Sequence, residues 1–531
     1  MTLRMWMYDI AREQSPDLAM LRRLCQISLD SGYNALGLYL EHRFAWPATP
    51  WAHGKGAVTS EMIRELQSEF PDLQLIPFPN LLGHCEGFLY TETGTQYAEE
   101  RFKGLQADPS NPDFVALADR ILENTLDIFR SEIIHLGGDE TAQLGANPRS
   151  AAIIAEAAHN GEDGKAKIYG EHFKRLAETV LAAGRRPAVW GDMFAEHPSA
   201  LAYLPKQTLI FDWHYFNSPE TSASQFKEAG YEVVLCPALH TYNAAWMHLP
   251  QSERNVTDHV AAAQKMNAYG VCVTTWEMGL FGNYETVIPA IKASGEILNT
   301  SHTASFEVPR TLPEEELPYA KEVHAPIFMR AFLKESERYE EWARLMGVEL
   351  ADAGGLFSFG QIRSSLKCRF LLYGNPFLLW LRNREDLCGA PGDRALEIAE
   401  RALHMAPDAN GRGVSQFLKS AILFVRFAEK AHLAYAEGKP GEAHTALSPA
   451  RILFDDLARV AHATLLNCGG SRADIERCRI AKQHVEVVIS RIRSYGDGSL
   501  GYLPSFEMLS HPKFVPHDQG GWWLINRWAN E

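Results

Sequence analysis

The stretch NPDFVALADRILENTLDIFRSEIIHLGGDE (residues 111–140) contains a predicted helix followed directly by a predicted strand. Asn111 is a good N-cap, and Pro112 suits the first position of a helix. Apolar residues then recur at helical spacing as far as about Phe129 and predict one buried face. That face consists of Phe114, Leu117, Ala118, Ile121, Leu122 and Leu126. The apolar run that follows predicts a buried strand over residues 132–137.

The end of this strand carries two adjacent acids. His135 is followed by Leu136, two glycines, and then Asp139 and Glu140. Carboxylates are rarely buried without a partner or a task, and glycines beside them allow a sharp turn that leaves room for a ligand. Two neighbouring acids can be pushed apart in pKa, so that one stays ionised while the other holds a proton. Glycoside hydrolysis uses such a pair.

The same alternation of strands and helices extends over the first 300 residues. Eight strands are predicted near 4–9, 34–40, 73–79, 132–137, 186–190, 208–213, 231–236 and 270–276. Helices fill most of the intervals, and the second clear one runs from about 165 to 183 and ends at Gly184. This pattern predicts an α/β fold, a (β/α)8 TIM barrel. A doubly wound open sheet would want a glycine-rich phosphate loop after its first strand, where this chain has Tyr8-Asp-Ile-Ala-Arg12.

The rest of the chain has a different character. We predict a catalytic barrel over 1–300, a proline- and acid-rich linker over 301–325, a mostly α-helical domain over 326–495, and an aromatic tail over 496–531. The predicted helices lie near 326–346, 358–384, 393–405, 413–437, 441–464 and 472–493. This part of the chain contains no chemical motif, although it offers a possible homodimer surface.

Composition limits the class of protein. At 531 residues, with 46% hydrophobic and 22% charged residues, the chain should form two or three globular domains. Its net charge of -15 argues against nucleic-acid partners and anionic membranes. We expect no secretory signal and no membrane span. The eight cysteines are scattered without a C-x-x-C pair, which favours buried thiols in the cytoplasm.

Polar and aromatic side chains cluster at the predicted strand ends, where the active site of a TIM barrel lies. They are Asp9, Arg12, Glu41, His42, Asn80, His84, Asp139, Glu140, Trp190, Asp192, Asp212, Trp213, Tyr242, Trp246, Trp276 and Glu277. Indole rings suit the apolar faces of sugars, and carboxylates suit their hydroxyls. No phosphate loop, H-E-x-x-H or G-x-S-x-G pattern occurs, so we expect neither a cofactor nor a metal.

These motifs resemble those of glycoside hydrolase family 20, the β-N-acetylhexosaminidases, over roughly residues 4–297. His135-Leu-Gly-Gly-Asp-Glu140 fits H-x-G-G-D-E at every fixed position. Residues 4–12 resemble R-G-x-x-x-D-x-x-R, with Met5 in place of the glycine. Gly83-His84 matches the G-H after the third strand. Residues 190–192 resemble W-x-D/E, and Trp276-Glu277 is one residue shorter than W-x-E.

The resemblance implies an exo-acting, retaining enzyme in which the substrate's 2-acetamido oxygen attacks the anomeric carbon and forms an oxazoline. It implies that Asp139 holds the acetamido N–H, that Glu140 is the general acid and base, and that Tyr242 hydrogen-bonds the acetamido oxygen. The remaining candidates for substrate binding are Arg4, Glu41, His84, His135, Trp190, Asp192, Trp213, Trp246, Trp276 and Glu277. The two histidines either orient other groups or are structural. The expected substrate is a small glycan or glycoconjugate with a terminal β-linked N-acetylhexosamine.

Two features depart from the family's pattern. We expect no small α/β domain before the barrel, and Leu38-Tyr-Leu-Glu-His42 stands where many members have H-x-x-D-D. This leaves open which acid pairs with His84. Two alternatives remain: a retaining glycosidase with a carboxylate nucleophile, for which Glu277 is the candidate, and a non-catalytic sugar-binding barrel.

Overall fold

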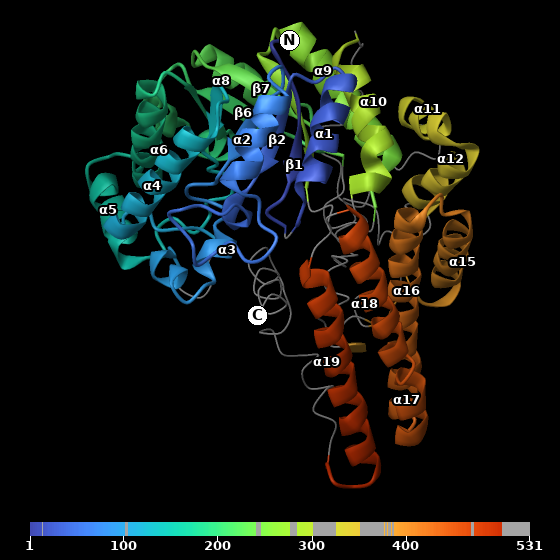
Figure 1. Cartoon of the computed structure of the whole chain (residues 1–531). Coiled ribbons are helices and arrows are strands. Elements are labelled where there is room, and N and C mark those ends of the chain that lie inside the picture. Colours follow the sequence, from blue (N-terminus) through green and yellow to red (C-terminus); the bar gives the residue numbers. More distant parts are fainter. Residues whose placement is uncertain are drawn as a thin grey trace. The chain divides into compact units, whose positions relative to one another are not determined.

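The computed structural model describes residues 1–12, 14–100, 105–239, 246–276, 284–300, 325–350, 376–377, 380, 384, 387–468 and 472–501 (Figure 1). The chain divides into two compact units. The barrel unit comprises residues 1–239, 254–276 and 291–310, and the helical unit comprises 240–253, 277–290 and 311–531. Two short segments inside the range predicted for the barrel therefore group with the helical unit. The predicted linker, except residue 325, and the tail after residue 501 lie outside the described residues.

Eight parallel strands form the sheet of the barrel unit, in the order β3-β2-β1-β8-β7-β6-β5-β4. The main-chain N–H of Leu81 donates to the carbonyl of Leu136 (3.0 Å), just beyond the edge strands β3 and β4, so the barrel is nearly closed. The (β/α)8 prediction is confirmed, and all eight strands lie within the predicted ranges or one residue beyond them. Their bounds are β1 Leu3–Asp9, β2 Ala35–Tyr39, β3 Gln74–Phe78, β4 Ile133–His135, β5 Arg186–Trp190, β6 Leu209–Trp213, β7 Glu232–Cys236 and β8 Gly270–Thr275.

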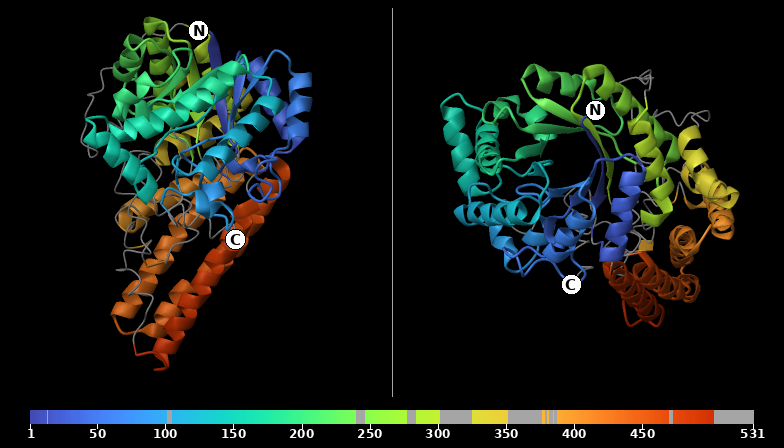
Figure 2. Two further views of the ribbon diagram at one scale, coloured as in Figure 1. Left: turned by 90° about the vertical axis from the view of Figure 1, so that its left-hand side faces the viewer. Right: turned by 45° about the horizontal axis from the view of Figure 1, so that its top comes forward.

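Helices surround these strands, as the right-hand view of Figure 2 shows for the barrel unit. The α-helices are α1 Leu18–Asp30, α2 Ser60–Glu69, α3 Glu86–Leu89, α4 Pro112–Ile128, α5 Pro148–His159, α6 Gly164–Ala182, α7 Asp192–Glu196, α8 Glu220–Glu228, α9 Leu249–Met266 and α10 Ile288–Leu298. Short 3-10 turns are η1 Glu41–Arg43, η2 Gly94–Tyr97, η3 Pro198–Ala202 and η4 Tyr284–Val287. The first residues of α9, the whole of η4 and the first residues of α10 belong to the helical unit.

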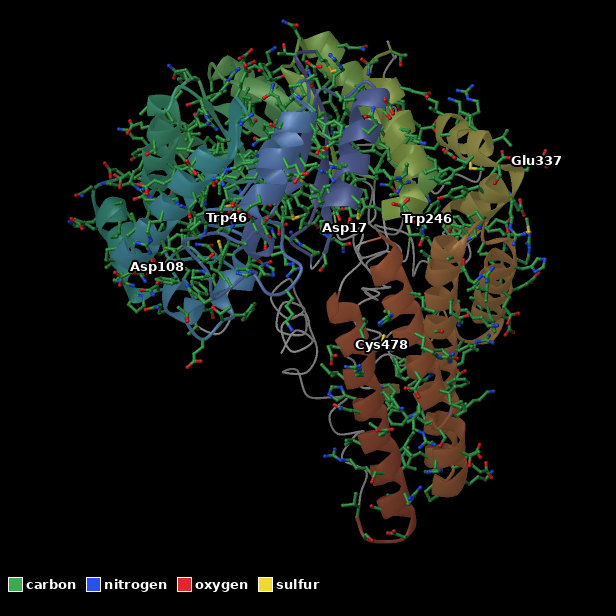
Figure 3. The ribbon with its side chains drawn as sticks, in the orientation of Figure 1. Asp17, Trp46, Asp108, Trp246, Glu337 and Cys478 are labelled. Carbon is green, nitrogen blue, oxygen red and sulfur yellow. The ribbon has the colours of Figure 1, made fainter. Side chains whose placement is uncertain are left out.

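Side chains at the helix starts explain where several helices begin. Asn111 accepts a hydrogen bond from the N–H of Asp113 and so caps α4, with Pro112 at the first helical position as predicted. Asp163 caps α6 by accepting from the N–H groups of Lys165 and Ala166. Asp17 caps α1 in the same way and is labelled in Figure 3. Each cap satisfies amide groups that have no partner inside the helix.

The interior of the barrel is filled by side chains from alternate strand positions. Met5 and Met7 come from β1, Phe78 from β3 and Phe211 from β6, all fully buried. The His135 ring lies among them, stacked on Phe78 with the ring centroids 4.2 Å apart. The barrel is therefore a packed core below its strand ends, and it supplies a rigid base for the groups above.

The helical unit is built from α11 Pro326–Glu335, α12 Glu337–Arg344, the π-turn η6 Leu345–Glu349, α15 Gly389–Met405, α16 Ala409–Ala436, α17 Pro440–Leu447, α18 Ala450–Cys468 and α19 Arg472–Gly496. The predicted α-helical character is confirmed. Two predicted helices are each two helices, because Ser336 caps a new helix within 326–346 and Ser448-Pro449 interrupts 441–464. Most of the helix predicted over 358–384 lies outside the described residues.

Among the described residues, no helix has both the length and the apolar content needed to cross a membrane. The described cysteines whose state is given, including Cys478 on α19 (Figure 3), are buried free thiols.

Candidate active site

The turn after β4 brings the two acids to the mouth of the barrel. Gly137 and Gly138 have φ of +83° and +108°, a region that other residues rarely adopt. A Cβ on Gly138 would lie 2.7 Å from the hydroxyl oxygen of Tyr169, which donates to the carbonyl of Gly138 (2.7 Å). Glu140 itself has φ of +50°. The surroundings hold this strained turn in place, as is common at functional sites.

His84 lies between three carboxylates. Its Nδ1 is 3.2 Å from Glu86 Oε1, and its Nε2 is 3.3 Å from both Asp139 Oδ2 and Glu140 Oε2. Burial alone would lower the pKa of His84, but Tyr39, Asp139 and Glu86 outweigh burial and raise it well above its ordinary value. The imidazolium can therefore donate to carboxylates on both sides. Glu86 pairs with His84 through Nδ1, the ring nitrogen that faces away from Asp139 and Glu140. The sequence had left open which acid pairs with His84.

The loop that carries His84 approaches the β4 turn closely. A Cβ on Gly83 would lie 2.1 Å from the carbonyl oxygen of Asp139, so a larger residue there would force the two loops apart. His84 has φ of +49°. The Gly83-His84 motif therefore serves a geometric purpose: it sets the imidazole against the acid pair.

Arg12 and Glu41 form a second ionic group beside this one. Arg12 Nη1 is 3.1 Å from Glu41 Oε1 and 3.6 Å from Asp9 Oδ1, and all three residues are buried. Burial and the charge of Glu86 raise the pKa of Glu41, although Arg12 opposes this. The Arg12 guanidinium also lies over the Tyr39 ring, 5.0 Å from its centroid.

Glu41, His84 and Glu86 are the one described group of side chains that could hold a metal ion, with ligand atoms within 4.8 Å of one another. Arg12 already faces Glu41, and the raised pKa of His84 favours its protonated form, which cannot ligate a metal. The ion pairs thus engage Glu41 Oε1 and both ring nitrogens of His84, while Glu86 Oε2 is buried without a hydrogen-bond partner among the described residues.

Three tryptophans lie at or just after the ends of β5, β6 and β8. Trp190, at the end of β5, is fully buried and 5.9 Å from the Trp276 ring. Trp276 Nε1 donates to the Tyr215 hydroxyl (2.6 Å), and Tyr215 stacks on Trp213 with centroids 5.1 Å apart. Trp213 and Trp276 are only partly buried, so their rings are available to a ligand. The arrangement can hold an apolar group such as a methyl or a sugar face.

Asp192 contacts the main chain of Glu140. Its Oδ2 accepts from the main-chain N–H of Glu140 (2.9 Å). Burial and the charge of Asp139 raise the pKa of Asp192 to about 8. His135 is different again: its Nδ1 accepts from the N–H of Gly137 (3.1 Å), and burial lowers its pKa well below its ordinary value. His135 is thus a neutral group that supports the turn from below.

The structure brings most of the predicted site residues to the carboxyl ends of the strands. These are Glu41, His84, His135, Asp139, Glu140, Trp190, Asp192, Trp213 and Trp276. Tyr242 and Glu277 lie outside the described residues. The roles assigned to all of these residues stay predictions.

Arg4 is placed differently from the prediction. It is the second residue of β1, and its guanidinium donates to the carbonyls of Gly32 and Met1 at the amino end of the barrel. Asp9 is five positions further along the strand, and a strand rises about 3.3 Å per residue. Arg4 therefore lies about 16 Å from the strand end, too far for a sugar-binding role, while Arg12 is the arginine that reaches the site.

Trp246 also departs from the prediction. It belongs to the helical unit and is 4% exposed. Its ring packs edge-on against Trp342, with centroids 4.8 Å apart, and its Nε1 donates to Thr286 (3.0 Å). Figure 3 labels its position. These contacts make Trp246 a core residue of the helical unit, where a sugar cannot stack on it.

Sequence reasoning left four neighbours of the acids without a role: Arg12, Glu86, Tyr169 and Tyr215. Arg12 follows a predicted strand end and Glu86 follows His84 by two residues, so each has a local signal in the sequence. Tyr169 comes from the middle of α6 and nothing in its local pattern distinguishes it from core. Only the fold shows that its hydroxyl reaches the β4 turn.

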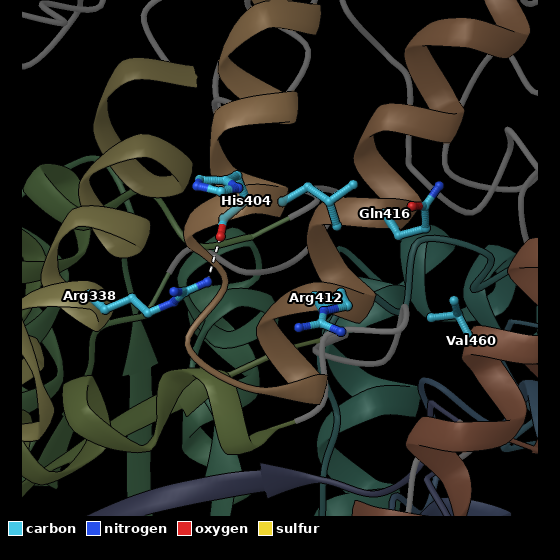
Figure 4. A pocket seen from close by; sticks show the side chains of 6 residues that line it. Arg338, His404, Arg412, Gln416 and Val460 are labelled. Atoms are coloured by element: carbon cyan, nitrogen blue, oxygen red, sulfur yellow. Dashed lines mark hydrogen bonds between the residues drawn. The ribbon is translucent and has the colours of Figure 1, made fainter.

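A separate cavity of about 470 Å³ lies in the helical unit and is lined by Arg338, Leu403, His404, Arg412, Gln416 and Val460 (Figure 4). Arg338 already donates to the carbonyls of His404, Met405 and Ala406, which end α15. The lining of this cavity contains no carboxylate, so the cavity offers no acid for glycoside chemistry.

Comparisons with known proteins point to one family. Residues 82–291 match the family model "Glycosyl hydrolase family 20, catalytic domain". A beta-hexosaminidase of Vibrio furnissii is 27% identical over 204 residues, which are 36% of this chain and 31% of that protein. The chain thus matches only about a third of the length of that curated relative.

Two solved structures are also similar. One is a GH20 exo beta-N-acetylglucosaminidase from Vibrio harveyi, at 16% identity and a TM-score of 0.47, covering 63% of this chain and 57% of that one. The other is a beta-N-acetylhexosaminidase from Bacteroides fragilis, at 15% identity and a TM-score of 0.46, covering 59% of this chain and 68% of that one.

Proposed function

From the match of residues 82–291 to the family model of the glycoside hydrolase family 20 catalytic domain, we propose that this protein is an exo-acting, retaining β-N-acetylhexosaminidase that releases terminal GlcNAc or GalNAc. One observation carries the proposal. His84 holds Asp139 and Glu140 side by side at the mouth of the barrel, 3.3 Å from its Nε2, next to partly exposed indole rings. Glycoside cleavage needs such a pair of acids, and Tyr215, which is hydrogen-bonded to Trp276, is near enough to Asp139 to interact with its charge.

The two acids take different roles in the proposed reaction. The substrate's acetamido oxygen bonds to C1 while the bond from C1 to the leaving oxygen breaks, and Glu140 gives its proton to that oxygen. Asp139 accepts a hydrogen bond from the acetamido N–H and stabilises the positive charge that develops there. Glu140 then takes a proton from water, which attacks C1 and reopens the oxazoline to the acetamide. Two inversions at C1 give net retention.

The exposure of the two acids supports this division. The Asp139 side chain is 8% exposed, whereas that of Glu140 is 33% exposed. The buried Asp139 carboxylate, held by His84, suits an acetamido group that stays in one place. A partly exposed one can reach both the leaving oxygen and the incoming water, which suits a general acid and base.

We further propose that the tryptophans enclose the acetamido group. Trp190 forms the floor beside His135, with ring centroids 4.5 Å apart, and Trp213 and Trp276 form the open walls. The Tyr215 hydroxyl links these two walls through Trp276 Nε1. Tyr242 remains the proposed hydrogen-bond donor to the acetamido oxygen, and Glu277 a proposed ligand of the ring hydroxyls.

The proposed setting is the cytoplasm, with small glycans or glycoconjugates as substrates. The support is the set of buried, unbridged cysteines, which suits a reducing compartment. The net charge of -15 supports the absence of nucleic-acid partners. A homodimer through the helical unit stays a prediction.

A direct assay tests the function. The protein should hydrolyse 4-nitrophenyl 2-acetamido-2-deoxy-β-glucoside and its galacto isomer, and leave the 2-hydroxy β-glucoside almost untouched. Glu132→Gln, on an exposed side chain at the far end of the β4 segment, serves as the matched control for Glu140→Gln. Rapid hydrolysis of the 2-hydroxy sugar would favour a carboxylate nucleophile, and no turnover of any glycoside would favour a binding protein.

A further inference from the structure

Asp192 contacts the catalytic turn in a way that does not require it to touch substrate. It is the first residue of α7, directly after β5, and its Oδ2 holds the main-chain N–H of Glu140 at 2.9 Å. Although the residue as a whole is partly exposed, its Oδ1 atom is buried and has no hydrogen-bond partner among the described residues. One oxygen is thus committed to Glu140 and the other lies in a confined space.

The surroundings of Asp192 disfavour a second negative charge. The charges of Asp139 and Glu140 act on it from the β4 turn, and His84 contacts both of these acids from the β3 loop. From α6, the Tyr169 hydroxyl is near enough to interact with both Asp192 and Asp139, and burial raises the pKa of Tyr169 well above its ordinary value. Tyr169 is therefore neutral and cannot balance an Asp192 carboxylate. Burial, together with the charges of Asp139 and Glu140, raises the pKa of Asp192 to about 8.

We propose that Asp192 is a positioning residue that works as a neutral carboxylic acid: its Oδ2 fixes the backbone of Glu140, and its proton, on Oδ1, lets it lie near Asp139 without opposing the charge of that acid. This differs from the substrate-binding role expected for Asp192. Its catalytic consequence rests on the proposed function, because only then does the Asp139 charge stabilise the transition state. An ionised Asp192 would repel Asp139 and weaken its hold on the acetamido N–H.

Asparagine imitates a neutral Asp192, which gives a sharp test. In Asp192→Asn the amide oxygen can still accept from Glu140 N–H, and the amide NH₂ replaces the acid proton. Asp192→Ala removes both groups. We expect Asp192→Ala to lose about 10²-fold in kcat at about pH 6, because a misplaced catalytic group costs that much, and Asp192→Asn to lose less than about 10-fold. Equal losses in the two folded variants would overturn the proposal.

The dependence on pH separates this role from a merely structural one. The ratio of kcat/KM of Asp192→Asn to that of the wild type should rise about 10-fold between about pH 6 and about pH 9, because only the wild type acquires the extra charge. Taking the ratio cancels the titration of Glu140, which both proteins share. A ratio that stays constant over this range would overturn the proposal.

A spectroscopic measurement decides the protonation state without any substrate. The infrared difference spectrum of wild type minus Asp192→Asn should contain the carbonyl stretch of a protonated carboxyl at about pH 6, and this band should be lost by about pH 9. Absence of the band at the lower pH would overturn the proposal. Since this measurement does not depend on activity, it remains decisive even if the hexosaminidase assay fails.

Discussion

At the scale of single residues, the site depends on one imidazole that contacts two acids with different tasks. His84 Nε2 is equally distant, 3.3 Å, from Asp139 Oδ2 and Glu140 Oε2. The imidazolium lowers the cost of holding two carboxylates together, and Glu86 in turn holds His84 through Nδ1. Because the two acids have different tasks, each is tested by its own amide substitution, which preserves the shape of the side chain.

Glu140→Gln should remove most activity on substrates with poor leaving groups, by about 10²–10⁴-fold, because the leaving oxygen no longer receives a proton. Activated aryl glycosides need this proton less, so their first step should slow less. The measurement is kcat/KM across a series of aryl leaving groups, with Glu132→Gln as control. A loss of equal size across the series would count against the acid role of Glu140.

Asp139→Asn should slow the first chemical step and weaken binding of a thiazoline that mimics the oxazoline. The amide keeps the shape of the acid but cannot stabilise positive charge on the acetamido nitrogen. Inhibition constants for wild type and variant measure the effect, and Asp127→Asn, on an exposed side chain of α4, is the control. Trapping of a 2-fluoro sugar as an ester on Glu277 would contradict the substrate-assisted mechanism.

The stability of the protein should also report Asp192. Its pKa is raised from 3.8 to about 8 on folding, so between these values the folded state keeps a proton that the unfolded state has released. The folded state then binds more protons, and the free energy of unfolding falls as the pH rises through this window. Relative to Asp192→Asn, the wild type should lose melting temperature from about pH 6 to about pH 8 and change little above that. A constant difference in melting temperature would mean that Asp192 is ionised throughout.

At the scale of elements, the approach of the β3 loop to the β4 turn decides whether His84 meets the acids. The predicted strands were close to those observed because alternate residues fill a barrel interior and the runs are bounded by polar turns. Two helices predicted as continuous are each two helices in the structure. The sequence pattern does not reveal the breaks, because the short interruptions at Ser336 and Ser448 hardly disturb apolar periodicity. How near two loops come to each other is not encoded in either loop alone.

Gly83→Ala should therefore lower both activity and stability. Its Cβ would lie 2.1 Å from the Asp139 carbonyl oxygen, which is main chain and cannot rotate away. We expect a loss of about 1–3 kcal/mol in the free energy of unfolding, as for overpacking elsewhere, together with a fall in kcat as His84 moves. Gly441→Ala is the control, because no heavy atom lies within 4 Å of its added Cβ. A Gly83→Ala protein with wild-type kcat would show that the loops tolerate separation.

At the scale of the whole molecule, a site at the mouth of a packed barrel should act on chain ends. The loop after β3 contains α3 and η2 and is the longest described at this rim. On chitooligosaccharides the product should be a single N-acetylhexosamine from the non-reducing end, followed over time by chromatography of reducing-end-labelled substrate. Internal cleavage that yields dimers and longer products would contradict the proposed function.

The amino-acid sequence by itself determined the barrel, its eight strands, the acid pair and most of the described residues that lie at the strand ends, because periodicity, capping and short motifs are local properties. Only the tertiary structure decided that Arg4 lies at the amino end while Arg12 reaches the site, and that Trp246 packs into the helical unit. It also decided that Glu86 is the partner of His84 and that Asp192 holds Glu140. These outcomes depend on barrel closure and on burial, which bring together residues far apart in the chain and set both their distances and their charges.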